Sequence, residues 1–216
     1  MNGLNSGSSL FYNITQEDLD QIYHCLRGRK KSFESGETIT SFGKDDPTIG
    51  IMASGVARLE RVNYFGECSL LDRMEKNDIF GESIVYADYE DSEISAVCEK
   101  NCEVIFVDHD RLIHPCEKAC DCHMTMMENL LQIMANKSVR LSRRVEVLSN
   151  KSIRNKLMAF FALQAKDHQS DTFELPFSVS ALADFICVDR SAMMREISKM
   201  KKEGIIRTDR RKITLL

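Results

Sequence analysis

The sequence predicts an α+β chain in which an N-terminal antiparallel β-barrel leads into a long helix and then into a C-terminal winged helix-turn-helix. Three observations support this fold class. Residues 33–108 alternate short β-branched or aromatic runs with turn residues, as barrels and jelly rolls do. An apolar seam with alternating spacings of three and four runs through 124–148. Two short helical segments and a basic hairpin follow residue 178.

The composition is that of a globular protein with an uneven distribution of charge. Of its 216 residues, 43% are hydrophobic and 29% are charged, and no apolar run approaches the ~20 residues of a membrane span. Residues 1–150 contain 16 Lys and Arg against 25 Asp and Glu, whereas residues 151–216 contain 13 against 8. We therefore expect an anionic partner for the C-terminal third alone. Because the first residues lack a basic segment followed by an apolar one, we expect a cytoplasmic protein.

The first expected element is a short helix that ends near residue 26, because Thr15 and Asp18 resemble a capping box. The barrel follows it. We expect the glycines of the barrel at turns that need unusual backbone angles. These glycines are Gly36, Gly43, Gly55, Gly66 and Gly81.

A long helix is expected over about 122–150, since neither proline nor glycine interrupts this range. It would be roughly 40 Å long at about 1.5 Å per residue. Only Ser138 is polar among its seam positions, and a narrow seam of this length is typical of a parallel homodimer. The alternative is a helix buried in its own domain. The expected dimer residues are Met124, Met127, Leu131, Met134, Ser138, Leu141, Val145 and Leu148.

The C-terminal segment has the capping and turn residues of a helix-turn-helix. Ser178 and Asp189 can cap two short helices, and Gly204 can end the second one. Residues 205–216 are expected to form two strands about a basic turn, which would make a wing.

Several segments, taken in this order, resemble one known family. They are Ser54-Gly55-Val56, Asp78-Ile-Phe-Gly-Glu82 and Leu182-Ala-Asp-Phe-Ile-Cys-Val-Asp-Arg-Ser191. The chain is similar over about residues 15–216 to the cyclic-AMP receptor protein / fumarate-nitrate regulator (Crp/Fnr) family of bacterial transcription regulators. The resemblance implies a cyclic-nucleotide-binding-like effector domain over 1–114, a long dimerisation helix and hinge over 115–150, and a DNA-binding domain over 151–216. It also implies a homodimer that binds a near-palindromic operator.

In such a motif the second helix lies in the major groove. Its solvent face is expected to carry Arg190, Ser191, Met194, Arg195 and Ser198. Similarity to the family places Arg190, Ser191 and Arg195 at its usual base-contact positions, and each arginine can bind guanine in a bidentate manner. Simple solvation of an exposed helix face is the alternative. Residues better placed for phosphate contacts are Ser178, Ser180, Lys199, Lys201, Lys202, Arg207, Arg210, Arg211 and Lys212.

The resemblance also implies an effector pocket between the barrel and the long helix. A cyclic nucleotide would need a Gly-Glu pair for the ribose and an Arg-Ser or Arg-Thr pair for the phosphate. Gly81 and Glu82 provide the first pair, although they can also be a purely structural turn. The second pair falls on Ser92 and Glu93, whose carboxylate would repel a phosphate, so cyclic AMP is not the expected effector. The expected pocket residues are Gly81, Glu82, Ser83, Ser92, Glu93, Leu141 and Ser142.

Eight cysteines in a chain expected to be cytoplasmic indicate thiols or metal ligands rather than disulfides. Cys116, Cys120 and His123 share one helix face, with Cys122 beside it. With a fourth ligand from Cys98, Cys102 or His114, they could hold Zn²⁺ or an Fe–S cluster. Packing of adaptable side chains and thiol redox sensing are the alternatives. The iron–sulfur regulator of the family uses an N-terminal cysteine run, whereas residues 1–30 contain only Cys25.

The sequence contains no nucleophile–base arrangement and no phosphate-binding loop, so we do not expect an enzyme. The leading hypothesis is a regulator gated by a small-molecule effector. The alternatives are a constitutive DNA-binding regulator with a scaffold barrel, and a regulator that senses thiol oxidation or metal through residues 116–122. RNA polymerase is a candidate partner, and a membrane is not expected.

Overall fold

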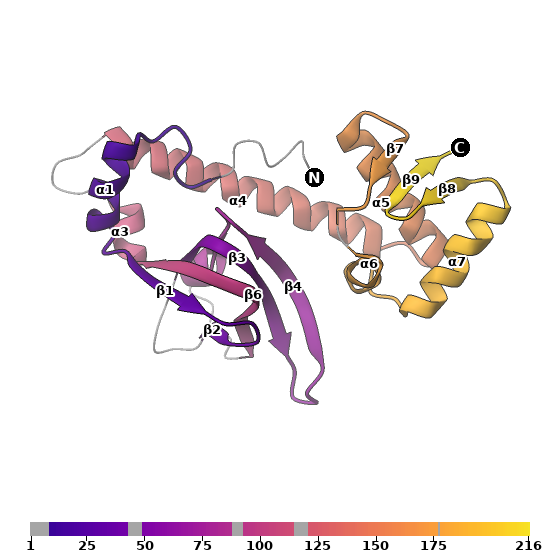
Figure 1. The fold of residues 1–216 in the computed structure, drawn as a ribbon, viewed down its shortest axis with the longest axis horizontal. Coiled ribbons are helices and arrows are strands. Elements are labelled where there is room, and N and C mark those ends of the chain that lie inside the picture. The colour runs from indigo at the N-terminus through magenta and orange to yellow at the C-terminus, as the bar shows by residue number, and fades with distance from the viewer. Residues whose placement is uncertain (1–8, 43–48, 88–92, 115–120, 177) are drawn as a thin grey trace. The chain divides into compact units, whose positions relative to one another are not determined.

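The computed structural model describes residues 9–42, 49–87, 93–114, 121–176 and 178–216. The chain divides into an N-terminal unit, Ser8–Met134, and a C-terminal unit that contains Ala135–Leu216 (Figure 1). The boundary lies within one continuous helix, α4 (Asp121–Leu148), which confirms the long helix expected from the seam. Within the described ranges, no helix has both the length and the apolar character needed to cross a bilayer.

The N-terminal unit is built on one six-stranded antiparallel sheet. Two 14-residue strands, β3 (Ile49–Val62) and β6 (Ile94–Val107), pair with each other at its centre. Along its other edge, each of these two long strands pairs with two shorter strands. These are β1 (Arg29–Phe33) and β2 (Thr38–Ser41) on β6, and β4 (Cys68–Glu75) and β5 (Ile79–Phe80) on β3.

The sequence predicts an antiparallel barrel or jelly roll, and the described strands do not close into a barrel. The strand order β1-β6-β3-β4 ends at β1 on one side and at β4 on the other, and no pairing among the described residues joins those two ends. Closure would require β1 or β2 to pair with β4 or β5, and the described residues contain no such pairing. The fold class is otherwise as expected.

Gly55 allows β3 and β6 to pair closely at an irregular point of the sheet. It lies inside β3 at φ +83°, where the register between the two strands shifts. A Cβ there would stand 2.3 Å from the carbonyl oxygen of Asn101 and 2.5 Å from the Cβ of Cys102. The sequence predicts a turn at Gly55, but the positive φ serves a bulge within a strand instead.

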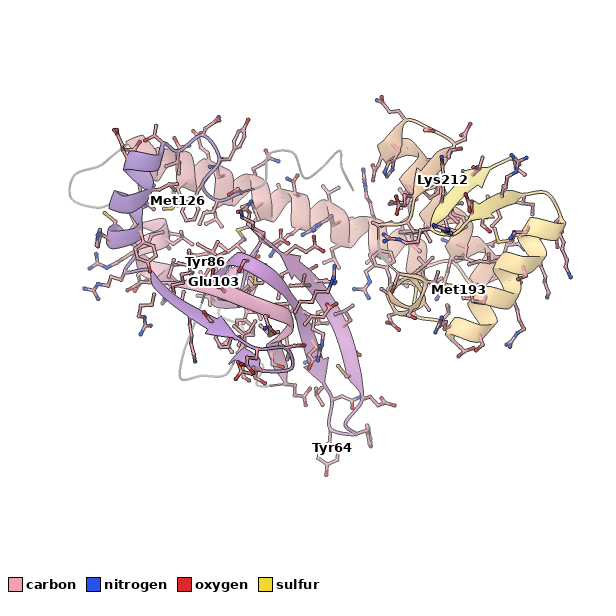
Figure 2. All side chains as sticks on the ribbon, viewed as in Figure 1. Tyr64, Tyr86, Glu103, Met126, Met193 and Lys212 are labelled. Atoms are coloured by element: carbon pink, nitrogen blue, oxygen red, sulfur yellow. The ribbon has the colours of Figure 1, made fainter. Side chains whose placement is uncertain are left out.

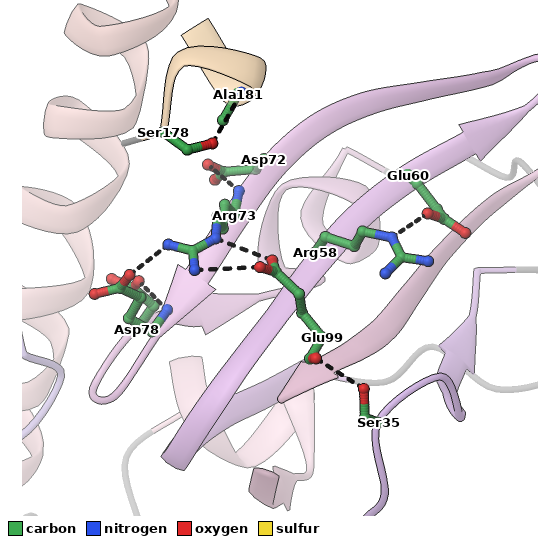
Figure 3. A network of polar contacts seen from close by, with 10 residues as sticks. Ser35, Arg58, Glu60, Asp72, Arg73, Asp78, Glu99, Ser178 and Ala181 are labelled. Carbon is green, nitrogen blue, oxygen red and sulfur yellow. Dashed lines mark hydrogen bonds and ion pairs between the residues drawn. The ribbon is translucent and has the colours of Figure 1, made fainter. Parts of the chain in front are cut away.

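The two faces of the sheet differ in character. Ala57 and Met74 are fully buried on the core side. Their neighbours Arg58 and Arg73 oppose each other across β3 and β4 on the other face. Arg58 pairs with Glu60 at 2.5 Å, and Arg73 pairs with Glu99 at 3.0 Å (Figure 3). Because each arginine has its own carboxylate, the repulsion between the two guanidinium groups is offset.

The β3–β4 hairpin ends in a turn with two exposed aromatic rings. Tyr64, at the tip, is 93% exposed (Figure 2), and Phe65 is 83% exposed. The carbonyl oxygen of the Asn63 side chain accepts hydrogen bonds from the backbone N–H groups of Phe65 and Glu67, each at 3.0 Å. The side-chain amide thus holds the turn.

Among its described residues, the N-terminal unit also contains three short helices and the first half of α4. They are α1 (Gln16–Cys25), α2 (Glu82–Tyr86) and α3 (His109–Ile113). Thr15 accepts a hydrogen bond from the N–H of Asp18 at 3.2 Å, which confirms the expected helix cap. The hydroxyl of Tyr86, at the end of α2, donates to the carbonyl oxygen of His109 at 3.1 Å and so joins α2 to α3.

The C-terminal unit combines four helices with a three-stranded sheet. The end of α4 is followed by α5 (Ile153–His168), α6 (Val179–Phe185) and α7 (Arg190–Lys202). The sheet has the order β7-β9-β8, with β7 (Thr172–Glu174), β8 (Ile206–Asp209) and β9 (Lys212–Leu215). The β8–β9 hairpin is the expected wing, and β7 is a third strand that the sequence did not indicate.

Candidate nucleic-acid interface

Helices α6 and α7 form the expected helix-turn-helix, and both begin at the expected caps. The hydroxyl of Ser178 accepts a hydrogen bond from the N–H of Ala181 at 3.2 Å. The carboxylate of Asp189 accepts one from the N–H of Ala192 at 2.8 Å. Between the helices, Cys187 adopts a left-handed conformation at φ +52°, which permits a tight turn.

Helix α7 has one buried and one exposed side. Met193, Ile197 and Met200 are buried in the core of the C-terminal unit at spacings of four and three. Arg190, Ser191 and Arg195, the three expected base-contact residues, are all exposed. A row of polar groups on the free side of a helix whose other side is fixed in a core has the form needed to enter a major groove.

Arg154 of α5 fixes one flank of α7. Its Nε donates to Glu196 at 2.6 Å, and its two terminal nitrogens donate to Glu203 at 2.7 and 2.9 Å. Hydrogen bonds with Glu203 and Glu196 raise the pKa of Arg154, and the same contact lowers the pKa of Glu203. Glu196 is therefore directed towards α5 and is paired there. Neither contact has a local signal in the sequence, because Glu196 and Glu203 are 42 and 49 residues from Arg154.

The residues expected to contact phosphates differ in whether their side chains already bind other groups of the folded domain. Ser178, Ser180, Lys199 and Arg210 are exposed, although the Ser178 hydroxyl also caps α6 and the Lys199 ammonium lies 4.0 Å from Glu196. Arg210 lies in the turn of the wing at φ +50°. In contrast, Arg211 is bound across the sheet, since its guanidinium donates to the carbonyl oxygen of Leu175 at 2.6 Å. Arg211 therefore contributes to the folding of the wing even in the absence of DNA.

The last turns of α4 are attached to α5 and to the helix-turn-helix. Arg143 donates to both carboxylate oxygens of Asp167, each at 2.9 Å. Arg144 donates to the carbonyl oxygen of Phe185 at 3.3 Å and lies over its ring, 5.3 Å from the centroid. Val147 is fully buried in the same core as α7. These contacts make the end of α4 part of the C-terminal unit.

The expected dimer seam is the most exposed apolar stripe of α4. Met124 is 62% exposed, Leu131 64%, Leu141 63% and Val145 54%. Ser138 is also exposed, whereas Met127, Met134 and Leu148 are half-buried. An exposed apolar stripe of this length is typical of a protein–protein interface.

A second stripe of α4, displaced by one residue from the seam, packs inside the N-terminal unit. His123, Met126, Leu130 and Ile133 are its buried members. The same helical positions after Ile133 are occupied by Lys137, Arg140 and Arg144, so this face of α4 is polar until Val147. The first half of α4 therefore has two apolar stripes and the second half has one, which agrees with a unit boundary after Met134.

The expected effector residues lie in both units. Gly81 is buried at φ +86° and precedes α2, whose first residue, Glu82, is 1% exposed. The hydroxyl of Ser83 donates to Glu82 at 2.9 Å. Glu93 is exposed and forms an ion pair with Arg61 at 3.3 Å. Leu141 and Ser142 are exposed on the part of α4 that belongs to the C-terminal unit, and Ser92 lies outside the described residues.

The segment that contains Glu82 and Glu93 is acidic. Residues 81–93 contain five acidic residues and no basic one. The carboxylate of Glu93, at the position expected for a phosphate partner, already has Arg61 beside it. A bound phosphate would add a further negative charge to this acidic segment.

The candidate metal ligands are only partly described. Cys116 and Cys120 lie outside the described residues, Cys122 is half-buried and His123 is 3% exposed. Burial lowers the pKa of His123, which favours the neutral ring. The described residues contain no group of three or more His, Cys, Asp or Glu side chains that could hold a metal ion.

Two family models match the chain. A Crp-like helix-turn-helix domain matches residues 155–216, and a cyclic nucleotide-binding domain matches residues 30–118. Among curated proteins, the global nitrogen regulator of Synechococcus elongatus is 22% identical over 191 residues, which cover 86% of this chain and 84% of that protein. The global nitrogen regulator of a Nostoc species is 20% identical over the same shares. None of these matches indicates a catalytic family.

Several solved structures share the fold of the chain. CprK in complex with OCPA has a TM-score of 0.72 at 16% identity, over 92% of this chain and 89% of that one. A CooA variant from Carboxydothermus hydrogenoformans has a TM-score of 0.67 at 16% identity, over 89% and 85%. The c-di-GMP responsive regulator CLP from Xanthomonas campestris has a TM-score of 0.62 at 14% identity, over 93% and 99%.

Proposed function

We propose a mode of action from the premise that this chain belongs to the Crp/Fnr family of DNA-binding transcription regulators, with an effector-binding domain and a Crp-like helix-turn-helix. The chain acts as a homodimer that binds a near-palindromic operator. An effector other than cyclic AMP gates this binding, and the chain has no catalytic activity of its own. Effector binding belongs to residues 1–114, dimerisation to 115–150 and DNA binding to 151–216.

The exposed seam of α4 is the observation that supports the proposed homodimer. Leu131, Leu141 and Val145 are each more than half exposed, although they recur at heptad positions. Pairing with the same seam of a second chain would cover all of them at once. The exposed Ser138 at an a position would then favour one register of the two helices.

The arrangement of α7 supports direct contacts with bases. Arg190 and Arg195 would each bind a guanine in the major groove, with Ser191 between them. The exposed hydroxyls of Ser178 and Ser180 at the start of α6, together with Lys199 and Arg210, would bind phosphates and set the position of α7. Because two chains are related by a twofold axis, the half-sites would be about one helical turn apart.

The acidic segment 81–93 supports an effector without a phosphate group. The folds of CprK, solved with OCPA, and of the c-di-GMP responsive CLP are both similar to this one, so the fold alone does not select the effector. The end of α4 is attached to α5 through Arg143 and to the helix-turn-helix through Arg144, and Val147 lies in their shared core. These contacts give the effector a route to α7. A change in how two α4 helices pack would move the DNA-binding domains with them.

A random-sequence DNA selection with the full-length protein tests the proposal. We expect enrichment of a near-palindromic motif. The mass of the complex with the selected duplex should correspond to two protein chains bound to one duplex. Selection repeated with metal ions, reductants and small molecules that shift the melting temperature tests the gating. Equal binding under all conditions would contradict gating and favour a constitutive regulator. Loss of binding on chelation or oxidation would instead favour the cysteine residues as the sensor.

A further inference from the structure

Met194 is an apolar residue on the exposed side of α7. Its side chain is 41% exposed, whereas the side chain of the preceding residue, Met193, is fully buried and packs in the core. Within the described C-terminal unit, the large apolar side chains exposed to a similar extent are otherwise confined to α4 and the terminal Leu216. The folding of the domain therefore does not account for a methionine at this position.

The position of Met194 on α7 is among the expected base contacts. It follows Arg190 by four residues and Ser191 by three, and it precedes Ser198 by four, so these side chains are neighbours on one helix surface. The flank of α7 that Arg154 holds carries Glu196 and Glu203 instead. Met194 is thus on the part of α7 that the proposed function directs into the major groove.

We propose that Met194 contacts the 5-methyl group of a thymine and so specifies a T·A pair in each half-site. This inference rests on the proposed function of α7. The thymine methyl is the one apolar group that the four standard bases display in the major groove. An unbranched, polarizable thioether adapts its shape to such a surface. In the proposed function the guanidinium groups of Arg190 and Arg195 bind acceptors on guanine, which leaves Met194 as the apolar side chain of this surface.

Replacement of thymine by deoxyuridine in the selected operator tests this contact, since it removes the methyl group and keeps base pairing. Each thymine is replaced in turn, together with its symmetry mate. We expect one position at which affinity falls about fourfold per half-site, or about 15-fold for both, as burial of one methyl-sized group predicts. Met194→Ala should bind the thymine and deoxyuridine operators equally. Ser198→Ala, on the next turn of the same surface, should keep the sensitivity of the wild type.

The outcomes separate this inference from the proposed function. A selected operator whose thymines can all be replaced without loss would overturn the role of Met194 and leave the function of α7 intact. Equal sensitivity in Met194→Ala and the wild type would overturn it too. A selection that enriches no motif would overturn both. Because Met194 is outside the core, Met194→Ala should melt within a few degrees of the wild type, and a melting curve checks this.

Discussion

Replacing Leu141 by alanine should weaken the homodimer without unfolding the chain. Complete burial of a leucine side chain is worth about 1.5–3 kcal/mol. Leu141 is 63% exposed in the single chain, so covering it in a dimer contributes about 1–2 kcal/mol per chain. The twofold axis places the substitution in both chains, which gives about 2–4 kcal/mol and a rise in the dimer Kd of about 30- to 1000-fold.

Sedimentation equilibrium of the full-length chain measures this change. Val139→Ala is a matched control, because Val139 is also exposed and apolar, at 45%, but lies outside the seam. The control should dissociate at the same concentration as the wild type. If Leu141→Ala and Val139→Ala have the same dimer Kd, the seam is not the interface and the argument from its exposure fails.

Three further predictions concern the DNA-binding helix, its anchor and the sheet. Arg195→Ala should lose about 1–3 kcal/mol of base discrimination per half-site while the dimer persists, and unchanged footprints would contradict this. Arg154→Met should lower the melting temperature at pH 7. Arg154 holds the pKa of Glu203 below its usual value, so the difference in melting temperature between variant and wild type should shrink as the pH falls through that pKa. A difference that does not change with pH would contradict a stabilising Arg154–Glu203 ion pair. Gly55→Ala should destabilise the N-terminal unit by more than about 3 kcal/mol in urea, against about 1 kcal/mol for Gly36→Ala, which has open space around its Cβ.

The sequence predicted the elements whose signals are local. Thr15, Ser178 and Asp189 cap helices because a side-chain oxygen needs only the N–H three residues ahead. The long helix followed from a periodicity that neither proline nor glycine interrupts. These features depend on a few consecutive residues, so a single sequence is enough to find them.

Features that depend on distant partners were not predicted. Gly55 was expected at a turn between short strands, but it lies inside the 14-residue β3, as does Gly50. A Cβ at Gly50 would stand 2.1 Å from the ring of Phe80, so this glycine allows a close approach rather than a turn. The ion pair between Arg143 and Asp167 spans 24 residues and had no local signal. The sequence analysis missed the second apolar stripe of α4, because its apolar positions do not continue beyond Ile133 but are followed by Lys137, Arg140 and Arg144.

The spacing of the two half-sites tests the central claim most directly. The selected operator is compared with versions in which five or ten base pairs are inserted at its centre, and the affinity of the full-length protein is measured for each. A homodimer held together by α4 cannot follow a half-turn rotation of one half-site, so the five-base-pair insertion should reduce affinity to that of a single half-site. Equal affinity for the original and the five-base-pair version would contradict a rigid dimer that binds both half-sites through α7.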